Sequence, residues 1–583
     1  MARSVTGAPL VEASSEELRA RLAAVEAALA AERRRADAEK VRADKLAADH
    51  ERLLAAYRQL QLELKLLRKS IFVASAERID TKQLALEFAA KEAELAKLAE
   101  ELGVPADESS PAPPAGESPP VPPVPPAKPK AKPKGRRDVA ALPLPEEREE
   151  ILDPELEGKA KRIGFEESYQ LGWRKGGPVR IVIARAKYLD TAKPEAPTIV
   201  TAPLPKRTFA RSLAAPSLLA KILADKYCDG LPLYRQEERF AREGLDLDRG
   251  TMCRWIEDAG MTAGCVAEAA KADAFATAFC ISTDATGVGI QPEPVEGKGR
   301  QPCRRGHFFV MVADRDHVLF EYVPRETSAA VRELFHGYSG YVQADAKNTY
   351  DVLFDKPDPA LAGEETFLRH EVGCWAHARR RFYQAAIGKD RIAREGLWRI
   401  HKLFDLDAGW KDEPPTKRKA LREASLRPLL DDFFTWAEAE YVKVKDTRGL
   451  LRSALGYVVR QREALRGFLA DGRLRLDNNV SERELRRIAV GRKAWLFVGS
   501  DDHAQATANL FTLIASCKLH DLDPEVYLRD LFRVLVHWPR DRYLELTPRY
   551  WAQTRARLDA KELKLPLGPL TVPERPTEQA GAS

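Results

Sequence analysis

The chain has 583 residues, of which 44% are hydrophobic and 31% charged, with a formal net charge of +6. This length excludes a single ordinary domain and predicts several, and the composition is typical of a soluble globular protein with some extended charged helix. No secretory signal pattern or apolar run of about 18 residues occurs, and the seven cysteines form no paired framework. We therefore expect a soluble protein of a reducing cytoplasm, and the local basic clusters indicate a polyanionic partner.

The N-terminal region lacks glycine and proline from Ser15 to Leu102. Leu18, Leu22 and Val25 recur at helical spacing in a background of Ala, Glu, Lys and Arg. The pattern predicts a helical arm over residues 1–102 that self-associates as a coiled coil. A helix folded back onto the body of the protein is the alternative.

Residues 103–140 form a predicted linker, because twelve of the 39 prolines fall between Pro105 and Pro133. It ends in the basic run AKPKAKPKGRR, which could neutralise phosphates or merely solubilise the chain. Residues 141–205 then form a small module in which PVRIVIARAKYL (178–189) alternates like a strand.

Residues 206–262 predict a helical region of helix-turn-helix type. A helix is expected through Arg242, then a break at Gly244 and a second short helix capped by Asp248. The residues expected to face DNA are Arg249, Thr251 and Arg254. Those expected to hold the helices together are Leu245, Met252, Trp255 and Ile256. Most helix pairs do not bind DNA, so a purely structural pair remains the alternative.

The next segments predict a sheet. FCISTDATGVGI (279–290) reads as a strand carrying Asp284, and residues 306–324 read as two strands around a turn. GYVQADAKNTYDVLF (340–354) is a short strand that delivers Asp345 before a helix, and residues 371–386 add a strand and a basic helix. This order is expected of a ribonuclease-H-like α/β sheet.

Two aspartates on neighbouring buried strands repel each other unless a cation lies between them, and hard oxygen ligands suit Mg²⁺ or Mn²⁺. A third acid is available in LDNNVSERELRRIAVGRKAW, where a helix starting near Asn479 places Glu482 on its first turn. Glu484 competes for that role. Each of these acids, taken alone, is more often a cap, a turn residue or an ion-pair partner than a metal ligand.

Basic and aromatic residues around the acids are candidate contacts for a phosphate backbone or an unstacked base. They are Lys347, Arg483, Arg486, Arg492, Lys493 and Trp495. Cys374 and His377 form a C-x-x-H pair, but no second pair lies nearby, and we interpret them as packing residues.

Several of these segments together resemble the transposases of the insertion sequence 66 family. The matching stretches are IFVASAERIDTKQLALEF (71–88), YCDGLPLYRQEERFAREGLDLDRGTMCRWIEDAG (227–260), STDATGV (282–288), GYVQADAKNTYDVLF, GCWAHARRRF (373–382), DNNVSERELRRIAVGRKAWLFVGS (477–500) and ATANLFTLIASCKLHDLDPEVYL (506–528). The likeness covers nearly the whole chain.

The resemblance implies a DDE transposase with a ribonuclease-H-like core whose acids fall on Asp284, Asp345 and Glu482. It implies two Mg²⁺ or Mn²⁺ ions, cleavage of a strand at transposon ends, and attack of the freed 3′-hydroxyl on target DNA. It further implies a homo-oligomer, small accessory proteins of the same element, and a bacterial cytoplasmic location at the nucleoid. A nuclease that does not join strands and a non-catalytic DNA-binding relic remain alternatives.

The chain departs from the family pattern in two places. Residues 141–205 stand where the family carries a zinc module but contain no cysteine or histidine, so we expect no structural zinc. Val73 and Ala74 replace a usual glycine. The remaining predicted divisions are a core from 263 to 389, a helical insertion from 390 to 464, the rest of the core with the third acid from 465 to 528, and a helical tail from 529 to 583.

Overall fold

A computed structural model describes residues 139–190, 198–210, 212–292, 301–354, 369–388 and 390–575, with scattered positions between 32 and 101. Most of the predicted coiled-coil arm, nearly all of the linker, and the segment 71–88 lie outside the described residues. The chain divides into two compact units, residues 1–125 with 382–399 and residues 126–381 with 400–583. Both sheets and all three candidate acids belong to the second unit.

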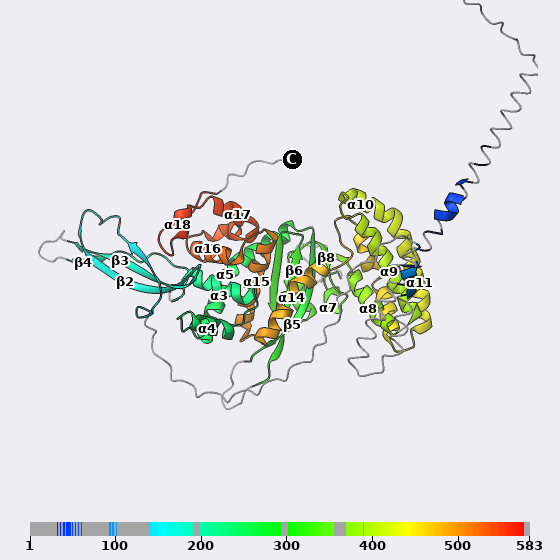
Figure 1. Ribbon diagram of the computed structural model, residues 1–583, viewed down its shortest axis with the longest axis horizontal. Helices are drawn as coiled ribbons and strands as arrows, with labels where there is room; N and C mark the ends of the chain where they lie inside the picture. The colour runs from blue at the N-terminus through cyan, green and yellow to red at the C-terminus, as the bar shows by residue number, and fades with distance from the viewer. Residues whose placement is uncertain are drawn as a thin grey trace, which may run out of the picture. The chain divides into compact units, whose positions relative to one another are not determined.

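The module without cysteine or histidine folds as a small sheet (Figure 1). Its strands are β1 (Glu146–Ile151), β2 (Lys161–Arg174), β3 (Gly177–Asp190) and β4 (Thr198–Thr201). β3 pairs in parallel with β1 and antiparallel with β2 and β4, which confirms the predicted strand at 178–189. Tyr188 is buried in this sheet and donates a hydrogen bond to Glu157 Oε2 at 2.7 Å. This hydrogen bond links the segment between β1 and β2 to β3.

Three helices follow, α3 (Pro216–Tyr227), α4 (Leu233–Arg242) and α5 (Arg249–Thr277). The prediction of one helix through Arg242 is wrong, because Gly230 adopts a φ of +69° and Pro232 follows it. The break at Gly244 and the cap by Asp248 are confirmed, since Asp248 accepts hydrogen bonds from two backbone N–H groups of α5. The second helix has 29 residues and is not short. The predicted division at 262/263 therefore falls inside it.

The described part of the central sheet has five strands, each of which overlaps a segment predicted to contain one. They are β5 (Cys280–Ile290), β6 (Arg304–Ala313), β7 (His317–Val323), β8 (Gly340–Gln343) and β9 (Arg369–Val372). Their spatial order is β7-β6-β5-β8-β9. β6 pairs antiparallel with both β5 and β7, whereas β8 pairs in parallel with both β5 and β9.

Both faces of this sheet are buried, as the alternation along β6 shows. Phe308 and Val310 belong to an apolar cluster with α5, α14 (Asn479–Trp495) and α15 (Asp501–Leu519). Phe309 and Met311 point to the other face and pack with α6 (Ser328–Leu334). Because successive side chains point to opposite faces, this run of buried residues makes β6 a central strand.

Helix α15 covers the edge strand β7. Thr512 Oγ1 accepts a hydrogen bond from Phe320 N at 2.8 Å, and Ser516 Oγ accepts one from Val318 N at 3.0 Å. These hydroxyls satisfy backbone groups that an open sheet edge would expose. Gly260 of α5 lets that helix approach α15 closely, since a Cβ there would lie 2.4 Å from the carbonyl oxygen of Ala506.

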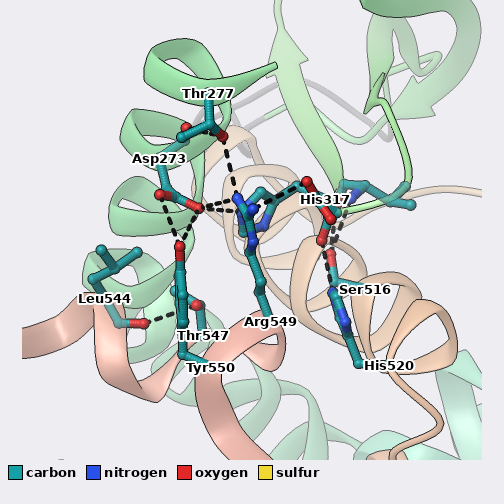
Figure 2. Close-up of polar contacts among 11 residues, drawn as sticks. Asp273, Thr277, His317, Ser516, His520, Leu544, Thr547, Arg549 and Tyr550 are labelled. Atoms are coloured by element: carbon teal, nitrogen blue, oxygen red, sulfur yellow. Dashed lines mark hydrogen bonds and ion pairs between the residues drawn. The ribbon is translucent and has the colours of Figure 1, made fainter. Parts of the chain in front are cut away.

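A buried carboxylate joins the long helix, the sheet and the C-terminal helices (Figure 2). Asp273 of α5 lies 2.8 Å from His317 Nε2 at the start of β7 and accepts a 2.8 Å hydrogen bond from Arg549 of α17 (Pro548–Ala556). Burial lowers the pKa of His317, although Asp273 opposes this shift. The contacts fix the C-terminal region to the core.

Residues 390–464 are predominantly helical, as predicted. The remaining helices are α7 (Asn348–Asp351), α8 (Trp375–Ile387), α9 (Arg391–Gly409), α10 (Pro415–Leu421), α11 (Arg427–Val444), α12 (Leu450–Arg460), α13 (Arg462–Arg466), α16 (Pro524–Val534) and α18 (Ala560–Lys564). The predicted divisions at 464/465 and 528/529 fall inside α13 and α16. Among the described residues, no helix is both long enough and apolar enough to cross a membrane.

Candidate active site

Asp284 lies in the middle of β5, on the face of the sheet covered by α14. Its position shares a face with Val288 and Ile290, which belong to the apolar cluster on that side. Burial raises the pKa of Asp284, and the charge of Glu482 raises it further. A 2.7 Å hydrogen bond from Ala285 N to Oδ1 opposes the shift.

Asp345 follows directly after β8, the parallel neighbour of β5. Ser282 pairs with Gln343, so Asp284 and Asp345 each come two residues after a paired position. Because parallel strands advance together, the two carboxylates are brought to the same part of the sheet. Asp345 Oδ1 is buried and has no hydrogen-bond partner among the described residues.

Glu482 lies on the first turn of α14, as predicted. Its Oε1 is 3.4 Å from His377 Nε2, and its Oε2 is 3.0 Å from Arg380 Nη2. The same His377 nitrogen is 3.5 Å from Asp345 Oδ2, so one ring lies between two of the acids. Glu484 instead forms an ion pair with Arg487 at 2.7 Å. The geometry favours Glu482 over Glu484 as the third acid.

Asn478 fastens the helix of the third acid to the strand of the first. It is fully buried, and its Nδ2 donates a 2.7 Å hydrogen bond to the carbonyl oxygen of Thr283. Its Oδ1 accepts a 2.6 Å hydrogen bond from Ser481 Oγ, and its backbone N–H lies 3.3 Å from Cys374 Sγ. Asn478 occupies the N-cap position of α14 but makes no side-chain cap there.

His377 is the site residue that the sequence interpretation missed. Cys374 is buried as a packing residue, as predicted, but the same prediction for His377 is wrong because its ring contacts two acids. The C-x-x-H spacing of Cys374 and His377 did not indicate a contact with the acids, since it resembles half of a zinc site. The available signal was that GCWAHARRRF is one of the blocks that resemble the family.

Some of the residues predicted to contact phosphate already interact with other parts of the protein, and others are exposed. Lys347 is close enough to lower the pKa of Asp284, but its ammonium also bonds Glu326 Oε1 at 3.1 Å. Arg492 donates to Thr286 Oγ1 at 3.1 Å and so holds the end of α14 to β5. Trp495 is half-buried against the core. Arg483, Arg486 and Lys493 are exposed on α14.

The predicted DNA contacts of the helical region form a separate set at the start of α5. Arg249 and Arg254 are exposed, and Thr251 contacts Asp248 Oδ2 at 2.6 Å and Arg254 Nη2 at 3.0 Å. The residues predicted to pack this region, Leu245, Met252, Trp255 and Ile256, are all buried.

The carboxylates fit a hard divalent cation by their chemistry, and the unpartnered Oδ1 of Asp345 supplies a free donor atom. Within the described ranges, however, no three His, Cys, Asp or Glu side chains are gathered closely enough to enclose one ion. Glu482 is turned toward Arg380 and His377. Glu482 would have to exchange these contacts to bind an ion together with Asp345.

A mixed sheet with acids on two neighbouring strands and a third on an adjacent helix is the arrangement of the DDE class of DNA strand-transferring enzymes. Comparison with known families agrees. Residues 211–506 match the model described as Transposase IS66 family, and residues 512–549 match the IS66 C-terminal element. The chain belongs to the IS66 transposase family, whose members transfer DNA strands.

Similar proteins occur in Sinorhizobium fredii. The uncharacterized protein y4qI is 30% identical over 437 residues, which cover 72% of this chain and 78% of y4qI. The uncharacterized protein y4hP is 30% identical over 376 residues, which cover 61% of this chain and 65% of y4hP. The chain thus spans somewhat less than two thirds of y4hP.

Proposed function

We propose that this protein cuts a DNA strand at the ends of a transposon and joins the freed 3′-hydroxyl to target DNA. The observation that supports this most is the set of interactions that connect Asp284, Asp345 and Glu482. His377 contacts two of these acids, and the charge of Glu482 shifts the pKa of the third. Carboxylates that act on one another in this way suit a metal-dependent phosphoryl transfer.

The architecture around the acids supports the same reading. Across the sheet the strands lie in the order β7-β6-β5-β8-β9, so the third strand along the chain is followed by the second, first, fourth and fifth. The first three strands along the chain pair antiparallel. Acids on the first and fourth of these strands, followed by a helix with a third acid, are the features of a ribonuclease-H-like core. We assign β5 to β9 with α14 to such a core.

Asp284, Asp345 and Glu482 are the residues that would hold two Mg²⁺ or Mn²⁺ ions. Such ions, when bound, activate the attacking oxygen and neutralise charge on the leaving oxygen. The protein's own contribution is positional: Asn478 fixes α14 on β5, while His377 and Arg380 orient Glu482. Arg483, Arg486 and Lys493 are free to contact the DNA backbone.

The reaction then has two balanced displacements at phosphorus. In the first, water forms a P–O bond at the transposon end while the 3′-oxygen leaves as a hydroxyl. In the second, that 3′-hydroxyl oxygen attacks a target phosphodiester, and the target's own 3′-oxygen leaves with a proton. No covalent bond to the protein forms in either step.

The partners we propose are transposon-end DNA, target DNA and further copies of this chain joined through residues 1–102. Arg249, Thr251 and Arg254 are proposed to contact DNA away from the acids. Small accessory proteins of the same element and a place at the bacterial nucleoid complete the proposal.

The test is strand transfer on labelled transposon-end DNA in Mg²⁺ and in Mn²⁺. The variants Asp284→Asn, Asp345→Asn and Glu482→Gln should lose joining by about 10³-fold or more while still binding DNA. Glu484→Gln is the matched control and should join normally, because that residue pairs with Arg487. Cleavage without joining by the wild type would favour a nuclease, and binding without cleavage, even with accessory proteins added, would favour a DNA-binding relic.

A further inference from the structure

A cavity lies on the same face of the sheet as Asp284. Its volume is about 390 Å³. Ser282 of β5 and Gln343 of β8 form a polar floor, with Ser282 Oγ 3.4 Å from Gln343 Oε1. Because a strand advances about 3.3 Å per residue, Ser282 lies about 7 Å from Asp284 along β5. The cavity is therefore close to the candidate active site.

Arginine dominates the wall of this cavity. The guanidinium groups come from the turn between β6 and β7, from α10, and from the segment that leads into α14. They belong to Arg315, Arg418, Arg473 and Arg475. Residues far apart in the chain thus place four cationic side chains around one hollow.

Two of these arginines already have a carboxylate partner. Arg418 pairs with Asp407 in the helical insertion. Arg473 pairs with Asp471 at 2.9 Å and stacks over the ring of Phe279. Of the two, only Arg473 has a carboxylate of its own, because Asp407 also pairs with Arg422.

The charges of the other two arginines are not compensated by a carboxylate of the described residues. Within the described ranges, no carboxylate lies at ion-pair distance from Arg315 or Arg475. Asp314 also lines the cavity, but its carboxylate accepts hydrogen bonds from two backbone N–H groups at the start of β5, at 2.7 and 3.1 Å. Partial burial lowers the pKa of Arg475, and the nearby charges of Arg315 and Arg483 add to this, with Asp477 opposing. Like charges held together at a cavity favour an anionic ligand.

We propose that this cavity, the arginine pocket, binds a backbone phosphate of the DNA strand that lies in the active site. The inference rests on the proposed function and deepens it. A DNA strand carries one phosphate per roughly 3.4 Å of helix axis, so a pocket about 7 Å from Asp284 corresponds to a position about two nucleotides from the scissile phosphate. Guanidinium groups match the phosphate oxygens with paired hydrogen bonds.

The test measures DNA affinity against salt concentration, using a fluorescent duplex of arbitrary sequence and the full chain. In the Arg315→Gln, Arg475→Gln double variant, the slope of log Kobs against log salt should become shallower by about 0.9 or more. Arg427→Gln is the matched control, because that exposed arginine pairs with Glu423 away from the pocket, and it should keep the wild-type slope.

The double variant Arg315→Lys, Arg475→Lys retains the charges and should restore most of the slope, which separates charge from folding. If the glutamine double variant folds and keeps the wild-type slope, the proposal that the arginine pocket binds a phosphate is wrong. The proposed function fails separately: Asp284→Asn should keep the salt slope and lose joining, whereas a wild type that binds no DNA would overturn both proposals.

Discussion

Asn478 shows how one side chain positions a candidate active site. Its amide spans the gap between α14 and β5 and is excluded from solvent. An aspartate of nearly the same shape would remove the donor to Thr283 and place a carboxylate beside that carbonyl oxygen. Burying an uncompensated charge is costly.

Asn478→Asp should therefore lower the free energy of unfolding by about 2–4 kcal/mol. Asn479→Asp is the matched control, because Asn479 is exposed at the start of α14, where a negative charge is favourable. Urea denaturation of the two variants measures the difference. Equal stabilities would show that the Asn478 bond does not fasten the helix.

His503 makes stability depend on pH. It lies on the first turn of α15, and burial lowers its pKa to about 3, with the charge of Lys226 adding to the shift. Glu257, 3.4 Å from Nδ1, would favour the charged ring but is outweighed by burial. Because the unfolded state takes up this proton near pH 6.5 and the folded state only near pH 3, stability falls as pH decreases between these values.

Between pH 7 and pH 5 the wild type should lose about 2 kcal/mol more stability than His503→Gln. The measurement is urea denaturation of both proteins at each pH. Parallel losses would show that His503 is protonated in the folded state as readily as in the unfolded chain.

At the scale of elements, a buried arginine ties the helical insertion to the segment before α14. Arg422 opens a π-helical turn, is fully buried, and bonds Asp407 at 2.7 Å. It also donates to the carbonyl oxygens of Phe468, Asp471 and Leu474 at 2.9–3.1 Å. These carbonyls belong to the chain that delivers Asn478 and Glu482, so the insertion is connected to the third acid.

Arg422→Ala should cost about 3–5 kcal/mol, because it removes one of the two arginines that pair with Asp407 and leaves three carbonyl groups without their donor. It should also slow strand cleavage although no acid is altered. Arg427→Ala, which breaks an exposed pair with Glu423, should cost less than about 1 kcal/mol. Thermal denaturation and a cleavage assay provide the measurements, and a stable but inactive Arg422 variant would separate positioning from folding.

The elements that the sequence predicted well are those whose pattern is local. Apolar runs marked β5, β6 and β7, and the start of α14 near Asn479 placed Glu482 on its first turn. The length of α5 was not predicted, because the helix is rich in alanine from Ala259 onward and packs closely on α15 at Gly260 instead of showing a broad apolar stripe. Such packing depends on a partner from another part of the chain.

At the scale of the molecule, the acids could be singled out as candidates because Asp284 interrupts an apolar strand and Asp345 follows one. His377 and the arginine pocket could not. His377 acts between acids that precede and follow it by more than 30 and 100 residues, respectively. Arg315 and Arg475 meet only because the sheet and the segment before α14 converge on one cavity. Contacts of this range leave no periodic trace in a sequence.

The central claim is that these carboxylates hold the metal ions of a strand-transfer reaction, and Asp345→Cys tests it most directly. Asp345 has the unpartnered buried oxygen, and a thiolate is a poorer ligand for Mg²⁺ than for softer ions. We predict that Asp345→Cys loses joining in Mg²⁺ and recovers it by about tenfold or more in Mn²⁺, while Asp345→Ala recovers in neither. Full joining by Asp345→Ala, or a cysteine variant equally inactive in both metals, would contradict the account.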